Sequence, residues 1–237
     1  MNTTIKHLGK FGLCGLMSLA LLSQACTAGS DDAKPKKPPQ QQSAAAGQPQ
    51  ALPAPQTSGG KPLMDALRER RTVRDYDSKP LAPQTLSNLL WAAFGVNRPG
   101  NKGRTAPSAH DAQEISIYVV TKEGVWLYDA FANSLQPVSN QDIRALTGKQ
   151  GFVKDAPVNL VFVSDMSKFR NDDDEYRRFY AAADTGYISQ NVYLFCASEG
   201  LATMVRAYID KPALAKALNL ASNQHIILAQ SVGYPEK

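Results

Sequence analysis

Residues 157–164 read PVNLVFVS, a run with large apolar side chains at both odd and even positions. A strand with this pattern is covered on both faces, so it lies in the centre of a sheet. The longest helix that the sequence predicts follows closely, from about Asp173 to Glu199, and is rich in alanine and aromatic residues. A buried central strand beside a long helix predicts a domain in which helices pack on a sheet.

Shorter helices and strands are predicted on both sides of this pair. Proline in a first turn, glycine at a helix end and alternating apolar residues mark them. The helices are Leu63–Arg71, Pro83–Gly95, Ser139–Gly148 and one that begins at Asp210, and the strands are Glu114–Thr121, Val125–Asp129 and Gln224–Tyr234. Together these elements predict an α+β domain with a mainly antiparallel or mixed central sheet flanked by helices.

The first quarter of the chain carries most of the net positive charge. Residues 1–62 contain six lysines and two aspartates, so they hold +4 of the formal net charge of +5. A nucleic-acid-binding domain concentrates Lys and Arg in its folded part, so we predict no nucleic-acid partner. The three cysteines, Cys14, Cys26 and Cys196, match neither a disulfide framework nor a zinc pattern, and no metal site is predicted.

Residues 1–26 are typical of a signal peptide. Two lysines precede Phe11–Leu22, an apolar run of 12 residues that is too short to span a bilayer. The run ends before a small residue and Cys26, which resemble a bacterial lipobox, although Ser23 stands where a large aliphatic residue is usual. Cleavage by the ordinary signal peptidase and an uncleaved anchor are the other interpretations. We expect an exported protein, periplasmic or on the outer surface, lipid-anchored to a bacterial membrane through Cys26.

Residues 27–62 have the composition of a disordered tether. Of these 36 residues, seven are proline, seven alanine and six glutamine, and Leu52 is the only large apolar side chain. Such a segment buries too little apolar surface to offset the entropy of ordering it. We therefore expect the folded domain to cover residues 63–237.

Three short clusters have the residue types of a binding site. Residues 70–74, RRTVR, set three guanidinium groups and a hydroxyl close together, which suits a phosphate dianion. The alternative is a solvated basic helix end. Residues 107–113, PSAHDAQ, form a loop of small side chains that a flat ring can approach, or an ordinary loop. Residues 200–203, GLAT, directly follow the long helix.

In this order and at these distances, the clusters resemble the motifs of the FMN-dependent nitroreductase family. That family has an R-[RH]-[ST]-x-[RK] stretch, a P-S-[SAG]-x-x-x-Q loop before a strand, and a long helix with Q-N-x-x-L followed by G-L-[GA]-[ST]. The helix motif is QNVYL at 190–194 here, and a terminal G-Y-P is matched at 233–235. The resemblance covers residues 63–237. It is nearest to the branch with the azoline (thiazole/oxazole) dehydrogenases, because of LLWAAFGVNR at 89–98 and AAADTG at 181–186.

The resemblance implies FMN as the cofactor and an intertwined homodimer with flavin sites at its interface. It also implies the contacts of individual residues. Arg70, Arg71, Thr72 and Arg74 would hold the phosphate and ribityl chain, Pro107, Ser108, Ala109 and Gln113 would reach the flavin from the partner subunit, Met204, Val205, Arg206 and Ala207 would lie along the ring near N5, and Lys237 would be the tail residue left for the phosphate. Arg206 and Tyr208 are candidate catalytic proton donors, or plain packing residues.

The function that the resemblance implies is hydride transfer through flavin N5, between a donor and a small organic acceptor, by an exported oxidoreductase. One alternative is an azoline-type dehydrogenase that acts on a modified peptide. Those enzymes use a Lys–Tyr pair for proton abstraction, and the sequence does not identify such a pair. Another alternative is a non-catalytic flavin-fold lipoprotein that serves as a binding module.

Overall fold

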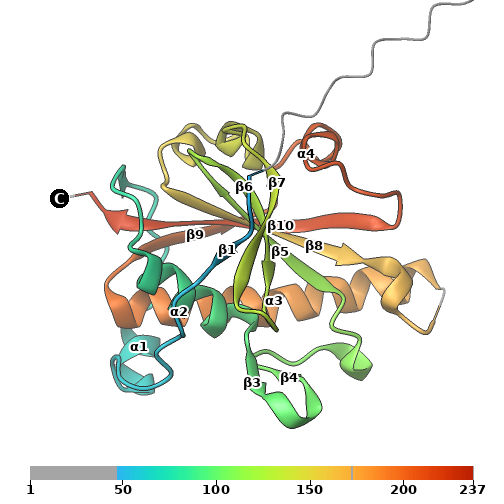
Figure 1. The fold of residues 1–237 in the computed structure, drawn as a ribbon, viewed down its shortest axis with the longest axis horizontal. Coiled ribbons are helices and arrows are strands. Elements are labelled where there is room, and N and C mark those ends of the chain that lie inside the picture. The colour runs from blue at the N-terminus through green and yellow to red at the C-terminus, as the bar shows by residue number, and fades with distance from the viewer. Residues whose placement is uncertain (1–46, 172, 237) are drawn as a thin grey trace, which may run out of the picture. The chain divides into compact units, whose positions relative to one another are not determined.

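The computed structural model describes residues 47–171 and 173–236 (Figure 1). The predicted signal peptide with Cys26, the first part of the predicted tether and Lys237 lie outside the described residues. Within these two ranges, no helix is long and apolar enough to cross a bilayer.

An antiparallel sheet forms the centre of the domain (Figure 1). Its strands are β1 (Gln50–Ala51), β2 (Tyr76–Asp77), β5 (Ile115–Thr121), β6 (Gly124–Asp129), β7 (Ser134–Ser139), β8 (Val158–Asp165), β9 (Ala202–Arg206) and β10 (Gln224–Pro235). They lie in the order β1-β7-β6-β5-β8-β10-β2, and β9 also pairs with β10. All of these pairs are antiparallel, so the predicted central sheet is confirmed in its antiparallel form.

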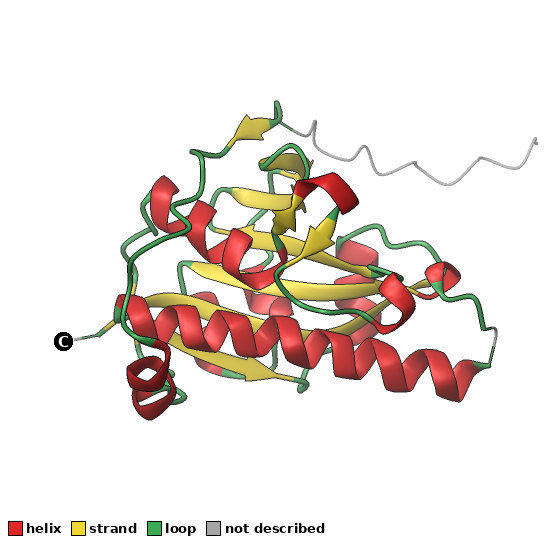
Figure 2. Cartoon of the chain, turned by 90° about the horizontal axis from the view of Figure 1, so that it is seen from below, coloured by secondary structure: helices red, strands yellow, loops and turns green. Residues whose placement is uncertain are grey.

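The four α-helices are α1 (Leu63–Glu69), α2 (Pro83–Phe94), α3 (Asp174–Glu199) and α4 (Lys211–Ala217). Short 3-10 helices lie at Pro99–Asn101, Ala109–Asp111, Arg144–Thr147, Gly151–Lys154 and Met166–Lys168, and β3 (Val96–Arg98) pairs with β4 (Gly103–Arg104) in a separate hairpin. Helix α3 runs along one face of the sheet, as Figure 2 shows. These four α-helices and the sheet make up the predicted α+β class.

Strand β8 is buried on both faces, as its sequence predicts. Leu160 and Phe162 belong to a core cluster with side chains of α2 and α3, such as Leu90 and Ile188. Val161 and its neighbours on the opposite face pack in a second cluster that includes side chains of α4. The sheet therefore separates two cores, and α3 is held to one of them by apolar contacts along its length.

Strand β7 and one helix illustrate how the structure differs from the sequence prediction. Strand β7 was not predicted because Pro137 lies inside it, and proline removes a ladder donor. The pairing of β6 with β7 shifts register beside Pro137, which accommodates it. The predicted helix from Ser139 to Gly148 is only a 3-10 turn over Arg144–Thr147. The Asp142 carboxylate accepts from the Arg144 amide there, a local bond that competes with a regular helix.

The folded domain begins before residue 63, which corrects the predicted tether. Strand β1 pairs with β7, and the Leu52 amide donates to the Asn133 carbonyl at 3.0 Å. The Pro53 carbonyl accepts from the buried Ser87 hydroxyl and from the Asn133 side-chain amide at 2.8 Å. These contacts are made by the main chain of the segment, and main-chain groups bond alike whatever the side chain. Composition therefore carried no sign of them.

Candidate functional site

The arginine-rich segment 70–74 is anchored to the C-terminal half of α3 by one tyrosine. The Thr72 hydroxyl lies 3.0 Å from the Tyr193 hydroxyl, and the Arg70 guanidinium lies over the Tyr193 ring, 5.2 Å from its centroid. Tyr193 itself is buried. The segment is thus fixed on α3 by a hydrogen bond and a cation–π contact, although no helix or strand includes residues 70–74.

The arginines of this segment form no direct salt bridge with the described residues. The guanidinium groups of Arg70, Arg71 and Arg74 are unpaired in this sense, whereas nearby Arg68 pairs with Asp65 at 2.7 Å and the neighbouring Glu69 pairs with Lys61 at 2.6 Å. Three neighbouring guanidinium groups without a direct carboxylate partner keep their donors available for a multivalent anion. This arrangement fits a phosphate group and does not fit a structural ion-pair network.

The GLAT motif brings β9 to the same place. Gly200 ends α3 in the left-handed conformation, with φ of 69°, which favours glycine. The chain then turns directly into β9, and the Val73 amide donates to the Thr203 carbonyl at 3.0 Å. A cavity of about 250 Å³ lies here, and Arg71, Cys196 and Thr203 are among its lining residues. The first and third sequence clusters therefore meet in one site.

The C-terminus reaches this site as well. Strand β10 pairs with β2 so that Pro235 lies opposite Tyr76, and the Glu236 amide donates to the Asp75 carbonyl at 3.3 Å. The predicted G-Y-P motif therefore lies beside the residues that directly follow the arginine segment in sequence.

Successive main-chain amide groups of β9 point in opposite directions. Met204 and Arg206 lie opposite Ser231 and Ala229 of β10, and the Val205 amide instead donates to the Tyr193 hydroxyl at 3.1 Å. The Ala207 amide, one residue past the strand, donates to no acceptor in the described part of the chain. Among the predicted ring contacts, the Val205 amide is already engaged.

Arg206 has a structural position, which contradicts its candidate role as a proton donor. It is only 4% exposed, and its Nη2 donates to Thr147 Oγ1 and Asn159 Oδ1, each at 2.7 Å. Nε donates to the Thr147 carbonyl at 3.0 Å, and Nη1 donates to Ser231 Oγ at 2.8 Å. Burial lowers the pKa of Arg206 to about 10, so the group stays charged at neutral pH. Its donors tie the 144–147 turn to β8 and β10.

Tyr208 is exposed beside a lysine that sequence reasoning missed. The tyrosine side chain is 64% exposed, and Lys149 Nζ lies 5.4 Å from its ring centroid. The Lys149 amide also donates to the Tyr208 carbonyl at 3.0 Å. Lys149 lies 59 residues earlier in the chain, and no local motif marks it. The fold therefore forms a Lys–Tyr pair next to the segment predicted to contact the flavin ring.

The loop at residues 107–113 is held in an unusual conformation. His110, Asp111 and Gln113 have positive φ angles of 52°, 52° and 46°. The Gln113 amide donates to Ser108 Oγ at 3.0 Å, and the Ala109 amide donates to Asp184 Oδ2 at 2.8 Å. Left-handed backbone costs free energy in residues other than glycine, so these bonds must offset that cost.

Within one chain, this loop and the arginine segment contact different parts of α3. Ala109 contacts Asp184, while Thr72 contacts Tyr193. Nine residues separate the two α3 positions, or about 14 Å along the helix axis. The fold of a single chain thus brings together residues 70–74, β9 and the chain end, and leaves the 107–113 loop apart from them.

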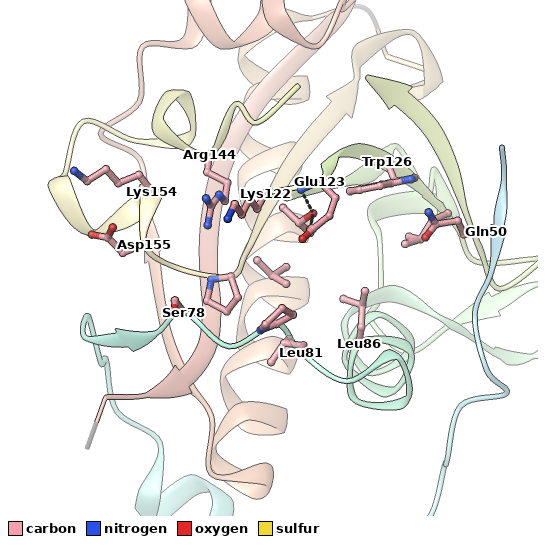
Figure 3. Close-up of a pocket in the computed structure, with 15 residues that line it drawn as sticks. Gln50, Ser78, Leu81, Leu86, Lys122, Glu123, Trp126, Arg144, Lys154 and Asp155 are labelled. Carbon is pink, nitrogen blue, oxygen red and sulfur yellow. Dashed lines mark hydrogen bonds between the residues drawn. The ribbon is translucent and has the colours of Figure 1, made fainter. Parts of the chain in front are cut away.

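A larger cavity of about 550 Å³ lies elsewhere on the domain (Figure 3). Leu81, Leu86 and Trp126 supply apolar lining, and charged side chains surround it, including Lys122 and Arg144 (Figure 3). Arg144 pairs with Asp142 at 2.8 Å. None of the residues predicted for the flavin site lines this cavity. No group of three or more His, Cys, Asp or Glu side chains in the described ranges is arranged to hold a metal ion.

Comparisons with known proteins agree with the geometry of the site. A model described as the nitroreductase family matches residues 67–234. A curated relative from Methanocaldococcus jannaschii, provisionally named a nitroreductase, is 33% identical over 160 residues, which cover 62% of this chain and 80% of the relative.

Solved structures show the same fold. The crystal structure of a provisionally named nitroreductase from Ralstonia eutropha JMP134 has a TM-score of 0.77 at 37% identity, over 81% of this chain and 91% of that chain. The E. coli microcin synthetase McbBCD complex with truncated pro-MccB17 bound has a TM-score of 0.62 at 21% identity, over 79% and 78%. The NADPH:FMN oxidoreductase from Vibrio harveyi complexed with NAD+ has a TM-score of 0.56 at 20% identity, over 74% and 69%. The family match spans most of the folded region and includes the arginine segment, the loop and β9, so the chain belongs to the nitroreductase family.

Proposed function

We propose that this protein is an exported, FMN-dependent oxidoreductase that acts on a small organic substrate. The observation that carries the proposal is the group of three arginines, Arg70, Arg71 and Arg74, which form no salt bridge within the described ranges and lie beside β9. When bound, FMN supplies a ring nitrogen, N5, that accepts and returns a hydride. Nitroreductase-family proteins are typically FMN-dependent oxidoreductases, which supports this choice of cofactor.

The chain's own residues would bind and orient the cofactor. Arg70, Arg71 and Arg74 would neutralise the phosphate, and the Thr72 hydroxyl, already oriented by Tyr193, would lie next to it. Since the Val205 amide is engaged by Tyr193, the Ala207 amide, which has no acceptor in the described ranges, is the proposed donor for the ring edge. Lys237 stays a proposed additional phosphate contact.

Tyr208 is the proposed proton donor or acceptor for the substrate. Its side chain is exposed next to the segment proposed for the ring, and the Lys149 ammonium lies over the tyrosine ring, 5.4 Å from its centroid. Arg206 is not part of this step, because its donors are bonded to the protein. Tyr208→Phe should therefore lower kcat more than it weakens binding of FMN.

A homodimer is part of the proposal. The 107–113 loop lies apart from the arginine segment of its own chain, so a second copy would have to supply it to the flavin. Exposed apolar side chains on α1 and α3 supply a surface for such contact, including Met64 at 73% and Phe179 at 65% exposure. Sedimentation of the purified protein would give the mass of the assembly, and a monomer at micromolar concentration would contradict this part.

Export and lipid anchoring rest on residues 1–26 alone. The charged head, the apolar run and Cys26 support a bacterial lipoprotein. Replacing Cys26 with Ser should move the protein from the membrane fraction to the soluble exported fraction if Cys26 is lipidated.

An azoline-type dehydrogenase on a modified peptide is a second candidate. The Lys149–Tyr208 pair favours it, because the proton abstraction expected of such an enzyme uses those two side-chain types. The fold likeness to the microcin synthetase complex is compatible with it. Turnover of an azoline-containing peptide that is lost in Lys149→Met would support this candidate over a small acceptor.

The cofactor is tested by reconstitution of the full chain with FMN. Wild-type protein should retain flavin through gel filtration, and Arg71→Ala should weaken FMN about 10- to 100-fold by removing a charged hydrogen bond. Arg68→Ala is the matched control, because Arg68 pairs with Asp65 and should leave FMN affinity unchanged. Wild-type protein that stays colourless with excess FMN would overturn the assignment. Bound flavin that no donor reduces would favour the binding-module alternative.

A further inference from the structure

Glu114 is a fully buried carboxyl group at the junction of the 107–113 loop and β5. Its exposed fraction is 0%, and neither carboxyl oxygen accepts a hydrogen bond from any donor in the described part of the chain. Its main-chain carbonyl accepts from the Asp165 amide at 3.0 Å, so the backbone is fixed in the sheet. A buried ionised carboxylate without donors is strongly disfavoured, so this side chain needs a proton or a cation.

Asp184 is the group that faces it. This α3 residue is only 2% exposed, and a protonated Glu114 would hydrogen-bond its carboxylate. Two adjacent ionised carboxylates in a buried site repel each other, whereas one shared proton converts the repulsion into a short O–H···O bond. That single proton also accounts for the Glu114 oxygens, which otherwise have no partner.

Among the described residues near the pair, Lys168 is the cation that acts on Glu114, and its ammonium is bonded to a main-chain carbonyl. The nearby charged and titratable groups are Asp165 at the end of β8, Lys168 after it, Tyr176 and Tyr180 on α3, and His110 and Asp111 in the loop. Lys168 Nζ donates to the Gln113 carbonyl at 3.0 Å, and the Asp165 carboxylate accepts from Ser167 and Asn223. Burial raises the pKa of Glu114 to about 7, and burial also raises that of Asp184.

Asp184 connects this proton to the loop. Its Oδ2 accepts from the Ala109 amide at 2.8 Å, at the start of the turn in which His110 and Asp111 have left-handed backbone. This turn stores conformational strain, and it is linked to α3 by the Asp184 bond and by the ring contacts of His110 with Tyr176 and Tyr180. A second negative charge at Glu114 would push the Asp184 carboxylate away from this position.

We propose that Glu114 and Asp184 share one proton and act as a positioning pair for the 107–113 loop. With the proton held, Asp184 keeps Ala109 and the loop in place; when the proton is lost, repulsion between the carboxylates loosens the loop. The consequence for flavin rests on the proposed function, in which this loop contacts the cofactor of the partner subunit. The response of the loop to pH does not rest on the proposed function.

The test uses hydrogen exchange of the flavin-free, full-length protein between about pH 5.5 and about pH 8.5, with rates corrected for intrinsic exchange. Protection of the Ala109 amide in wild type should fall on the order of tenfold as pH rises through 7. Glu114→Gln should keep protection constant, because an amide donates to Asp184 without a titrating proton. Glu175→Gln, which alters an exposed carboxylate of α3, should behave as wild type.

A second variant guards against misfolding of the first. In Asp184→Asn, the side-chain oxygen can still accept from Ala109, and its NH2 group can donate to an ionised Glu114, so protection should again be independent of pH. Constant wild-type protection over the whole range, or an equal fall in Glu114→Gln and Asp184→Asn, would overturn the proposal.

A parallel titration with FMN separates this proposal from the function. FMN affinity should fall with rising pH in wild type and not in Glu114→Gln. If no variant binds FMN while the exchange results hold, the proposed function fails and the carboxyl pair stands.

Discussion

The hydroxyl groups of Thr72 and Tyr193 lie 3.0 Å apart, and the Tyr193 hydroxyl also accepts a hydrogen bond from the Val205 amide at 3.1 Å. One buried side chain of α3 therefore connects the arginine segment to β9. A tyrosine hydroxyl has one proton and accepting lone pairs, so it can donate to Thr72 while it accepts from Val205. This oxygen fixes the relative position of the two predicted cofactor segments together with the main-chain hydrogen bond from Val73 to Thr203.

Tyr193→Phe should weaken the contacts of this site without creating a cavity in the core. The ring remains and Arg70 can still stack on it, while the Val205 amide and Thr72 lose their partner. We expect unfolding free energy to fall by about 1–3 kcal/mol and FMN affinity to fall with it. Urea denaturation and FMN titration measure the two effects. Tyr187→Phe, at an exposed position of the same helix, is the control, and an equal loss in both variants would contradict the role of the hydroxyl.

Arg206→Met should lower the unfolding free energy of the domain and should not specifically abolish catalysis. It removes the donor to the Thr147 carbonyl and hydroxyl and to the Ser231 hydroxyl, while Asn159 Oδ1 still accepts from Ser231. Each buried neutral acceptor left without a donor costs about 1–3 kcal/mol. Chemical denaturation should show this loss. A variant with wild-type stability and no activity would return Arg206 to the catalytic candidates.

The stability of the domain should fall as pH rises from about 4.5 to about 7. Burial raises the folded-state pKa of Glu114 from 4.5 to about 7, so in this window the folded protein holds a proton that the unfolded chain releases. The unfolded state binds fewer protons, so unfolding free energy decreases with pH, by about 3 kcal/mol for this group. Above pH 7, the protonation of Glu114 no longer contributes to the unfolding free energy. Denaturation of Glu114→Gln at matched pH values should lack this slope.

Asn133→Asp should release the segment 50–56 from the domain. Aspartate keeps a preference for the left-handed backbone at this position, where φ is 44°, but loses the donor to the Pro53 carbonyl. We expect a loss of about 1–2 kcal/mol in unfolding free energy. Limited proteolysis should show faster cleavage between residues 50 and 56. Unchanged cleavage would mean that the β1–β7 pairing holds the segment by itself.

Local patterns were sufficient for most of the fold. The apolar run of β8, the proline at the start of α2 and the glycine at the end of α3 each act within a few residues, so their elements could be predicted within about two residues of the observed ends. The arginine, loop and GLAT clusters were also visible, because their chemistry lies in consecutive side chains.

Long-range contacts needed the folded chain. Arg206 was predicted as a site residue because its neighbours in sequence match a predicted site motif, and its four acceptor atoms come from three other segments. Lys149 contacts Tyr208, which lies 59 residues later in the sequence, and Glu114 faces Asp184, which lies 70 residues later. No periodicity in the sequence predicts such pairs. Residues 50–56 join the domain through main-chain bonds that composition does not reveal. Local side-chain preferences determine the order of the helices and strands. The protonation state of a side chain, and whether its polar atoms are free to bind a ligand, depend on the groups that the tertiary fold packs around it.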